Sequence, residues 1–464
     1  MIRLLNAYFP ARTFFLGISE ACLICLALLV ATVVRLGSGA GAYLFNYQHG
    51  AFKILVASMA IITCMYYFDL YESSILGNRR EVVIRLTQVL STVYILSVLL
   101  YYVYPRLELG RGIFVIGLGF VGMLLLVWRE LFLMINRVPK FAARTLILGD
   151  GPIGESLARE LGLRPELGMR VVGQIKSLEN GHGRSAQGAS EVHAGTLLSS
   201  VKFYAPDHII VAMGERRGCL PVEALLELKN SGITIHDSTQ FYEAVTGKVS
   251  IDVLRLSWLL FSSGYSASRH LEICKRILSS ILAFLGLVLA LPLTVSIALV
   301  IFLDSGAPVI FRQERVGRHG KPFILFKFRT MKSSADTDNC PPPTEIGDSR
   351  FTRIGRVLRR SHLDELPQLI NILLGDMDFI GPRPFVPNQE QQCLENIPHY
   401  RQRFAIRPGL TGWAQVNRGY NASIEDNKEK LAYDLFYIKN QSVGLDLLIL
   451  LKTMKVVLLG RGAR

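Results

Sequence analysis

Four apolar stretches near the start of the chain constrain its fold more than any other feature. They cover about residues 14–36, 51–69, 84–104 and 112–134. Each is close to the roughly 20 residues that a helix needs to cross a lipid bilayer. Hydrophobic residues also make up 50% of the whole chain. We therefore predict a block of four transmembrane helices over residues 1–140, in preference to four helices of a soluble core.

The chain is also basic, with 51 Lys and Arg against 37 Asp and Glu. An apolar yet basic composition is typical of a membrane protein whose exposed parts meet anionic lipids or anionic substrates. Nucleic acid is not expected as a partner, because the sequence has no zinc-finger or RNP pattern. The basic flanks of the apolar stretches place both ends of the block in the cytoplasm. These flanking residues are Arg3, Arg12, Arg79, Arg80, Arg85, Arg129, Arg137, Lys140 and Arg144.

Residues 141–260 have a different pattern, which begins with "ARTLILGDGPIGESLARELG". It predicts a strand, a glycine turn and a helix. Gly149, Gly151 and Gly154 match Gly-x-Gly-x-x-Gly in the strand-to-helix context that the motif requires. We predict a small Rossmann-like α/β domain over this range.

The next strand of this domain, "MRVVGQI", lacks the acidic residue that usually binds a ribose at its end. Gln174 and Lys176 stand there instead. Further strands are expected at 208–212 and 233–236. We favour a structural or regulatory domain, and NAD binding stays open as the alternative.

A fifth apolar stretch contains 27 uncharged residues, from Ile277 to Leu303. Basic clusters lie on both sides of it, so a simple crossing would put the second cluster outside the cell. Pro292 lies near the middle, where a proline removes one helical hydrogen bond and bends the helix. We predict a re-entrant helix over about 271–303 that enters the membrane and returns to the same face. A simple span is the alternative.

The stretch "LRRSHLDELPQLINILL" contains two adjacent carboxylates, Asp364 and Glu365. Because proline is tolerated only in the first turn of a helix, Pro367 predicts that a helix begins near Asp364. The positive end of that helix and Arg359 would lower the carboxylate pKa values and attract phosphate. An ionised Asp could attack phosphorus while the Glu binds Mg²⁺. An ordinary acidic helix cap is the alternative.

Several cations surround this pair in the sequence. In "FILFKFRTM", alternation puts Lys327 and Arg329 on one side of a strand, where two cations suit a diphosphate. The rigid turns "GPRP" and "RPGLTGWAQVN" contain Arg383 and Arg407. Together with the acidic pair they predict the lining of a phosphate-binding site.

Four motifs, "KFRTM", "LDELPQLINILLGDMDFIGPRP", "RPGLTGWAQVN" and "YDLFYIKNQSVGLDLLILLKT", resemble the bacterial sugar transferase family. These enzymes are polyprenyl-phosphate hexose-1-phosphate transferases, or monotopic phosphoglycosyltransferases. The resemblance covers roughly 266–464. The four spans and the Rossmann-like domain before it resemble the long form of the family, and "MIRLLNAYFP" looks like its exopolysaccharide branch.

The resemblance implies a reaction in which a UDP-sugar and undecaprenyl phosphate give undecaprenyl-diphosphate-sugar and UMP. It implies Asp364 as nucleophile of a phosphosugar-enzyme intermediate and Glu365 as ligand of Mg²⁺. The family's other polar positions fall on Lys327, Arg359 and Arg383. Such a reaction starts exopolysaccharide or O-antigen assembly.

The resemblance also implies the fold and the location. We expect a four-span helical membrane block, a Rossmann-like domain, and an α/β catalytic domain over 266–464 whose re-entrant helix breaks at Pro292. The family's helix often has a serine before this proline, whereas Leu291 precedes it here. The expected setting is the bacterial inner membrane, with its lipid as partner and the catalytic domain on the cytoplasmic side. The oligomeric state stays open, and the large N-terminal membrane block is compatible with a homodimer.

Two other functions fit parts of the sequence. A membrane-anchored nucleotide-sugar dehydratase or epimerase would need Tyr-x-x-x-Lys, but Tyr204 and Tyr242 are followed four residues later by His208 and Thr246. A non-enzymatic scaffold that senses a ligand and binds lipid is the second alternative.

Overall fold

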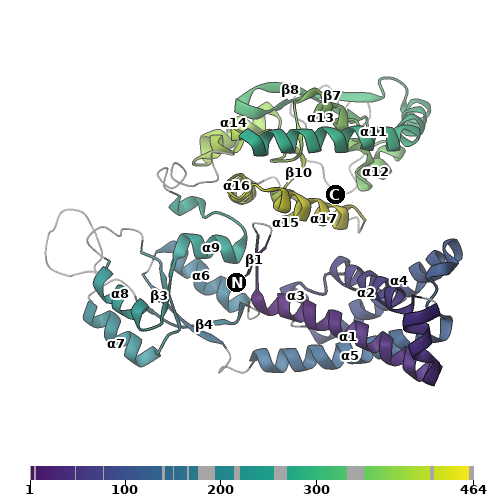
Figure 1. Cartoon of the computed structure of the whole chain (residues 1–464). Helices are drawn as coiled ribbons and strands as arrows, with labels where there is room; N and C mark the ends of the chain where they lie inside the picture. Colours follow the sequence, from purple (N-terminus) through teal and green to yellow (C-terminus); the bar gives the residue numbers. More distant parts are fainter. Residues whose placement is uncertain are drawn as a thin grey trace. The chain divides into compact units, whose positions relative to one another are not determined.

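The computed structural model describes residues 2–4, 7–47, 49–76, 78–137, 142–149, 151–164, 167–175, 194–213, 220–254, 269–331, 350–418 and 423–458 (Figure 1). Contacts between residues divide the chain into two units. The first unit contains residues 1–2 and 9–238. The second unit contains residues 3–8 and 239–464.

All four predicted membrane stretches are helices. They are α1 (Ala11–Leu36), α2 (Gly50–Tyr67), α4 (Arg79–Val103) and α5 (Arg111–Arg137). Among the described residues, these four helices and α11 of the second unit are long and apolar enough to cross a membrane. The prediction of a membrane-associated helical block is therefore confirmed.

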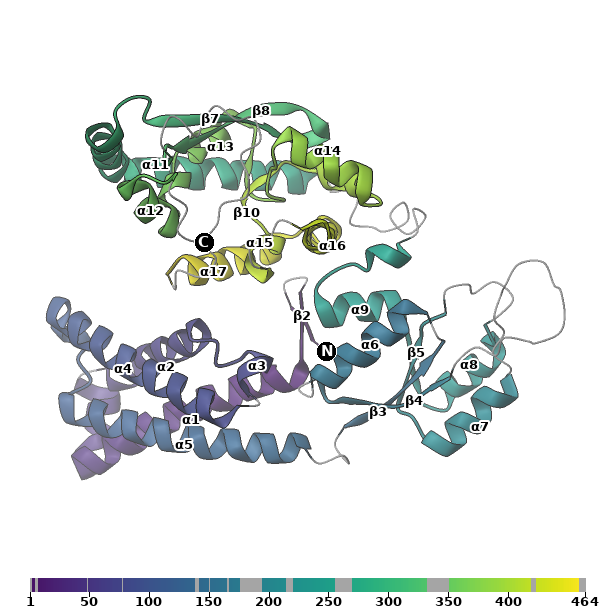
Figure 2. The ribbon, with the colours of Figure 1, turned by 180° about the vertical axis from the view of Figure 1, so that it is seen from behind.

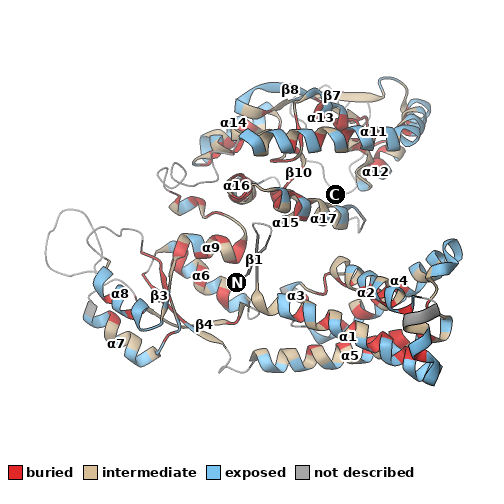
Figure 3. Ribbon diagram, in the orientation of Figure 1, coloured by how far each residue is buried: buried red, intermediate tan, exposed pale blue. Residues whose placement is uncertain are grey.

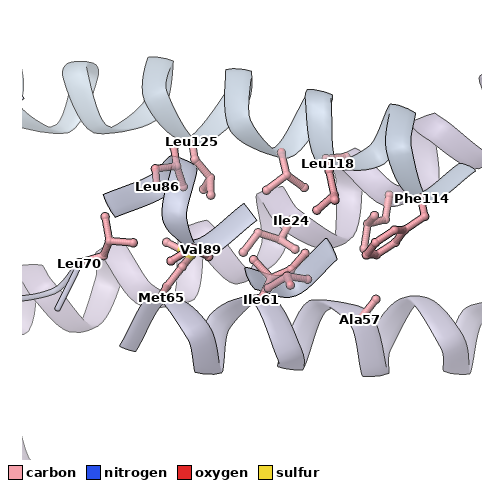
Figure 4. Close-up of a cluster of buried hydrophobic side chains, with 14 of the residues drawn as sticks. Ile24, Ala57, Ile61, Met65, Leu70, Leu86, Val89, Phe114, Leu118 and Leu125 are labelled. Carbon is pink, nitrogen blue, oxygen red and sulfur yellow. The ribbon is translucent and has the colours of Figure 1, made fainter. Parts of the chain in front are cut away.

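Apolar side chains from all four helices form the centre of the block. Ile24 of α1, Ile61 of α2, Val89 of α4 and Leu125 of α5 are all buried there (Figure 4). The outer faces are also apolar but exposed (Figure 3); Ile95, for example, is 59% exposed. An apolar surface of this extent is unusual on a soluble protein and is what a lipid environment requires.

One buried ion pair joins the first and last helices of the block. Arg129 of α5 is 3% exposed, and its Nε lies 2.6 Å from Oε1 of the fully buried Glu20 of α1. Arg129 also donates to the carbonyl of Leu70, which follows α2. A buried ion pair that loses one partner leaves an uncompensated charge, so each of these residues depends on the other.

The sheet of the first unit has four parallel strands in the order β4-β3-β5-β6. They are β3 (Ala143–Leu148), β4 (Met169–Ile175), β5 (His208–Val211) and β6 (Thr234–Asp237). The helices are α6 (Pro152–Leu163), α7 (Ala194–Tyr204) and α8 (Val222–Asn230). In chain order the strands run 2-1-3-4, so the chain crosses from one side of β3 to the other; this is the doubly wound order of flavodoxin-like sheets, whereas a Rossmann half has the order 3-2-1.

The glycine turn after β3 needs its first glycine. Gly149 has φ +118°, and a Cβ there would lie 2.8 Å from the backbone of Ala212. Gln174 occupies the position of the acidic residue that binds a ribose in dinucleotide-binding domains. Its side-chain amide donates to the carbonyl of Gly149 at 2.9 Å. Gln174 thus braces the turn, while Lys176 lies outside the described residues.

The second unit is an α/β domain. Two strand pairs lie in its long segment: β7 (Ile310–Val316) with β8 (Pro322–Phe328), antiparallel, and β9 (Asp378–Ile380) with β10 (Gly409–Thr411), parallel. Residues 3–8 contribute most of a third, short pair, β1 (Ile2–Leu4) with β2 (Ala7–Phe9). Its helices are α9 (Ser238–Thr246), α11 (Arg269–Ser305), α12 (Arg353–Arg360), α13 (Gln368–Leu374), α14 (Pro387–Asn396), α15 (Trp413–Asn417), α16 (Ile424–Lys439) and α17 (Val443–Leu458).

The boundary between the units lies earlier than expected. Residues 239–254 were assigned to the Rossmann-like domain, but they pack on the second unit. Lys248 lies 2.9 Å from Glu429, and Trp413 donates to the carbonyl of Gly247 at 2.8 Å. These partners are far apart in the chain, so local sequence patterns could not reveal the contacts.

Helix α11 runs over 37 residues with Pro292 inside it. In Figures 1 and 2 its C-terminal part runs in a different direction from its N-terminal part. Both parts pack on the same domain: Ala283 contacts the cluster around Leu369, and Ile301 contacts the cluster around Phe328. The helix therefore stays with one domain along both of its halves.

We predict that Glu20→Ala destabilises the protein by about 3 to 5 kcal/mol, because Arg129 would stay buried without its partner. Thermal unfolding in detergent micelles measures the change. The control is Arg79→Ala, which removes the exposed pair between Arg79 and Glu130 and should cost less than about 1 kcal/mol. Equal unfolding temperatures for Glu20→Ala and Arg79→Ala would contradict the role of the buried pair.

Candidate active site

The two adjacent carboxylates lie in a short turn between helices α12 and α13. Leu363–Glu365 forms a 3₁₀ turn after His362, which has φ 57°. Helix α13 begins only at Gln368, with Pro367 as its N-cap. The prediction that a helix begins near Asp364 was therefore wrong, because the tighter turn occupies these positions before the proline. The pair still lies directly before the N-terminus of α13.

Glu365 is held by two cations from distant parts of the chain. Nζ of Lys327, on β8, lies 2.9 Å from Oε1 of Glu365. Nη2 of Arg383, in the segment after β9, lies 2.8 Å from the same oxygen. Burial alone would raise the pKa of Glu365, but Arg383 and Lys327 together lower it below its ordinary value. The predicted lowering thus holds in direction for Glu365, which is ionised at neutral pH, but its main causes are Arg383 and Lys327, where a helix end and Arg359 were expected.

Asp364 behaves differently from its neighbour. It is 8% exposed. Burial raises the pKa of Asp364, and Glu365 adds to this, while Lys327, Arg359 and Arg383 oppose it. The net direction is upward, so the predicted lowering of this pKa was wrong. A poorly solvated carboxylate next to three cations is more basic than a surface carboxylate and is also a better nucleophile.

Arg359 is brought to the pair by helix α12. Its guanidinium lies over the ring of Phe351, 4.9 Å from the ring centroid. The charge of Arg359 acts on Asp364. Stacking on a ring restricts the orientation of a guanidinium.

Arg329, predicted to share a face with Lys327, is not part of this cluster. Its side chain is 2% exposed and donates to the backbone carbonyls of Ser305 and Gly306. It therefore caps the C-terminal end of α11, where a cation complements the helix dipole. The alternation of side chains between the two faces of β8 does not apply to Arg329, because the strand ends at Phe328.

In the contacts of the described residues, Arg407 pairs with Asp378 and not with Asp364 or Glu365. Its Nη1 is 3.9 Å from Asp378, the first residue of β9. Arg276 of α11 lies 3.7 Å from the same carboxylate. Arg407 thus belongs to the base of the β9–β10 pair, and its predicted role in substrate binding stays a prediction.

Arg276, which no sequence motif singled out, lies at the end of α13. Its Nη1 lies 2.6 Å from the carbonyl of Ile372 and its Nη2 lies 3.1 Å from the carbonyl of Leu373. This guanidinium joins α11 to the C-terminus of the helix that follows the acidic pair. Its only signal in the sequence was its place in the basic flank of the apolar stretch.

The adjacent carboxylates fit a magnesium ion that shares its ligands with a substrate. Among the described residues, no group of three or more His, Cys, Asp or Glu side chains could hold a metal ion by itself. Mg²⁺ needs only one or two carboxylates, and substrate phosphates and waters complete its coordination. Asp364 and Glu365 supply such a donor set, and the hydrogen bonds from Lys327 and Arg383 described above both reach Oε1 of Glu365.

The part of the chain that contains the acidic pair and its cations is similar to known proteins. Residues 270–460 match the family described as Bacterial sugar transferase. A UDP-N-acetylgalactosamine-undecaprenyl-phosphate N-acetylgalactosaminephosphotransferase of Aeromonas hydrophila is 40% identical over 235 residues, which is 50% of this chain and 54% of that protein. The chain thus spans about half the length of this relative.

Two relatives share the printed name UDP-glucose:undecaprenyl-phosphate glucose-1-phosphate transferase. The protein of Caulobacter vibrioides is 41% identical over 189 residues, covering 40% of this chain and 70% of that protein. The protein of Escherichia coli is 34% identical over 320 residues and 66% of each chain. The acidic pair, its cations and these similarities together lead to one assignment: the chain belongs to the bacterial sugar transferase family.

Proposed function

We propose that the protein transfers a hexose-1-phosphate from a UDP-sugar to undecaprenyl phosphate, giving undecaprenyl-diphosphate-sugar and UMP. The observation that carries the proposal is the buried carboxylate of Asp364 beside Lys327, Arg359 and Arg383. The relatives named above act on glucose or N-acetylgalactosamine derivatives, so the proposal leaves the identity of the hexose open. The product would start exopolysaccharide or O-antigen assembly.

The proposed reaction has two displacements at one phosphorus. An oxygen of Asp364 attacks the phosphorus next to the sugar, an aspartyl phosphosugar bond forms, and the bond to UMP breaks. The phosphate oxygen of the lipid then attacks the same phosphorus and releases Asp364. One phosphoanhydride is broken and one is made, so no further energy source is needed. Partial desolvation favours Asp364 as nucleophile, because its basicity is raised.

The cations supply the electrostatic part of the reaction. Phosphoryl transfer depends mainly on positioning and on neutralising charge on the phosphate oxygens. Lys327 and Arg383 are already oriented by Glu365 before a substrate arrives. Glu365 would hold the Mg²⁺ ion, and the ion would further neutralise the charge of the diphosphate.

We also propose that α11 is re-entrant and that the catalytic domain lies on the cytoplasmic face of the inner membrane. Two facts support this: both halves of α11 pack on one domain, and basic clusters flank it on both sides. Such a helix would keep Asp364 near the bilayer surface, where a lipid-borne phosphate and a water-soluble nucleotide can both reach it. The homodimer stays a prediction.

We expect Asp364→Asn to lower UMP release at least about 1,000-fold, because an amide cannot form the covalent intermediate. The assay uses purified protein, radiolabelled undecaprenyl phosphate, Mg²⁺ and a panel of UDP-sugars. Glu395→Gln, an exposed change on α14, is the control and should keep full activity. Full activity of Asp364→Asn would contradict the proposed mechanism and favour a non-enzymatic scaffold.

The raised pKa of Asp364 also predicts the pH dependence. The nucleophile must be ionised, so kcat/KM should rise with pH through a pKa above the ordinary value of an aspartate. Lys327→Met removes the charge that lowers this pKa most, and it should move the acid limb to higher pH. Lys321→Met, on the exposed turn before β8, should leave the limb unchanged. An acid limb that stays in place or moves to lower pH in Lys327→Met would refute the assignment.

A further inference from the structure

The segment Pro382–Phe385 holds Arg383 without any regular secondary structure. Two of its four residues are prolines, which have no N–H group to place in a helix or a ladder. Its four consecutive carbonyls nevertheless all accept hydrogen bonds, each from a different donor. The donors are N of Gly409 to Pro382 (2.9 Å), Nη2 of Arg403 to Arg383 (2.8 Å), Nη1 of Arg315 to Pro384 (3.2 Å) and N of Val316 to Phe385 (3.2 Å).

The donor to Arg383 itself is a buried arginine. Arg403 is 4% exposed and lies in the 3₁₀ turn Tyr400–Ala405. Its Nη1 is 3.1 Å from Glu390 of α14, and its Nη2 is 3.2 Å from Asp434 of α16. The planar guanidinium suits such a site, because its donors point in fixed directions toward several acceptors.

Aromatic rings complete the surroundings of Arg403. Its guanidinium lies 4.7 Å from the ring centroid of Phe385 and 5.0 Å from that of Tyr400. Rings on the faces and carboxylates at the edge leave this side chain little freedom to move. The backbone carbonyl of Arg383 therefore accepts a hydrogen bond from a guanidinium, that of Arg403, whose own position is restricted on all sides.

The direction of the Arg383 side chain depends on this backbone. Arg383 follows Glu365 by 18 residues in the sequence, and its Nη2 lies 2.8 Å from Oε1 of Glu365. A small rotation of the Pro382–Phe385 segment would move the guanidinium away from the carboxylate, and misplacement by about 1 Å can cost a large factor in rate.

We propose that Arg403 is a positioning residue for the transfer reaction. Buried and held by Glu390 and Asp434, it fixes the backbone of Arg383 and so aims the Arg383 side chain at Glu365 and the substrate phosphate. Arg403 itself touches neither carboxylate of the Asp364–Glu365 pair in the contacts of the described residues. This inference rests on the proposed transferase function.

The test is a double-mutant cycle between Arg403 and Arg383. Arg403→Lys keeps the charge but not the planar fork, and Arg383→Lys keeps a cation but not its reach. In otherwise unchanged protein, Arg403→Lys should lower kcat/KM by about 10-fold to 100-fold, the range for losing a hydrogen bond from a charged group. In the Arg383→Lys background the same change should cost less than about 3-fold, because its target is already lost.

The matched control is Arg418→Lys. Arg418 also pairs with two carboxylates of the same domain, Asp426 at 3.2 Å and Glu429 at 3.0 Å. It has no role in the proposal, so its cost should be below about 2-fold and equal in both backgrounds. If Arg403→Lys does not fold, Asp434→Asn replaces it in the cycle, since it keeps the side-chain volume and removes the negative charge of one partner of Arg403.

Equal losses from Arg403→Lys in both backgrounds would overturn the positioning role and leave Arg403 as a purely structural residue. The absence of UMP release from the unsubstituted protein would instead overturn the proposed function, and the positioning role with it. A loss confined to the background that retains Arg383 supports the proposal.

Discussion

The attachment of α11 to one domain at both of its ends is the constraint on which the rest of the structure depends. Near its start, Arg276 donates to the carbonyls that end α13. At its end, Arg329 donates to Ser305 and Gly306. The whole helix has 37 residues and would measure roughly 55 Å if it were straight, well beyond the thickness of one bilayer core. A bend at Pro292 lets a helix of this length return to its own domain.

A second constraint is electrostatic. Glu365 forms ion pairs with Lys327 of the β7–β8 hairpin and with Arg383 of the β9–β10 region. One carboxylate thus joins two separate parts of the domain. The same cations only partly offset the cost of burying Asp364. The two adjacent carboxylates therefore differ: the pKa of Glu365 is lowered, whereas the pKa of Asp364 is raised, which suits their proposed roles as metal ligand and nucleophile. Different surroundings, not different chemistry, produce the difference.

Much of this could be predicted from the sequence, because length, periodicity and special residues are local signals. The four membrane helices, the glycine turn at Gly149 and the acidic pair with Lys327 and Arg383 are of this kind. Arg329 was misplaced because alternation assumes that a strand continues, and the strand ends one residue earlier. Arg403 was missed because its partners come from three different elements, and no spacing within one segment encodes such contacts.

The most direct test of this account is the side of the membrane on which each end of α11 lies. His270→Cys places a single exposed thiol in the first turn of the helix and Glu314→Cys places one after it, each in a background without the seven native cysteines. A membrane-impermeant thiol reagent applied to sealed inside-out and right-side-out vesicles reports the side. The account predicts that both positions react from the cytoplasmic side. Labelling of the two positions from opposite sides would contradict it, since α11 would then be a simple span.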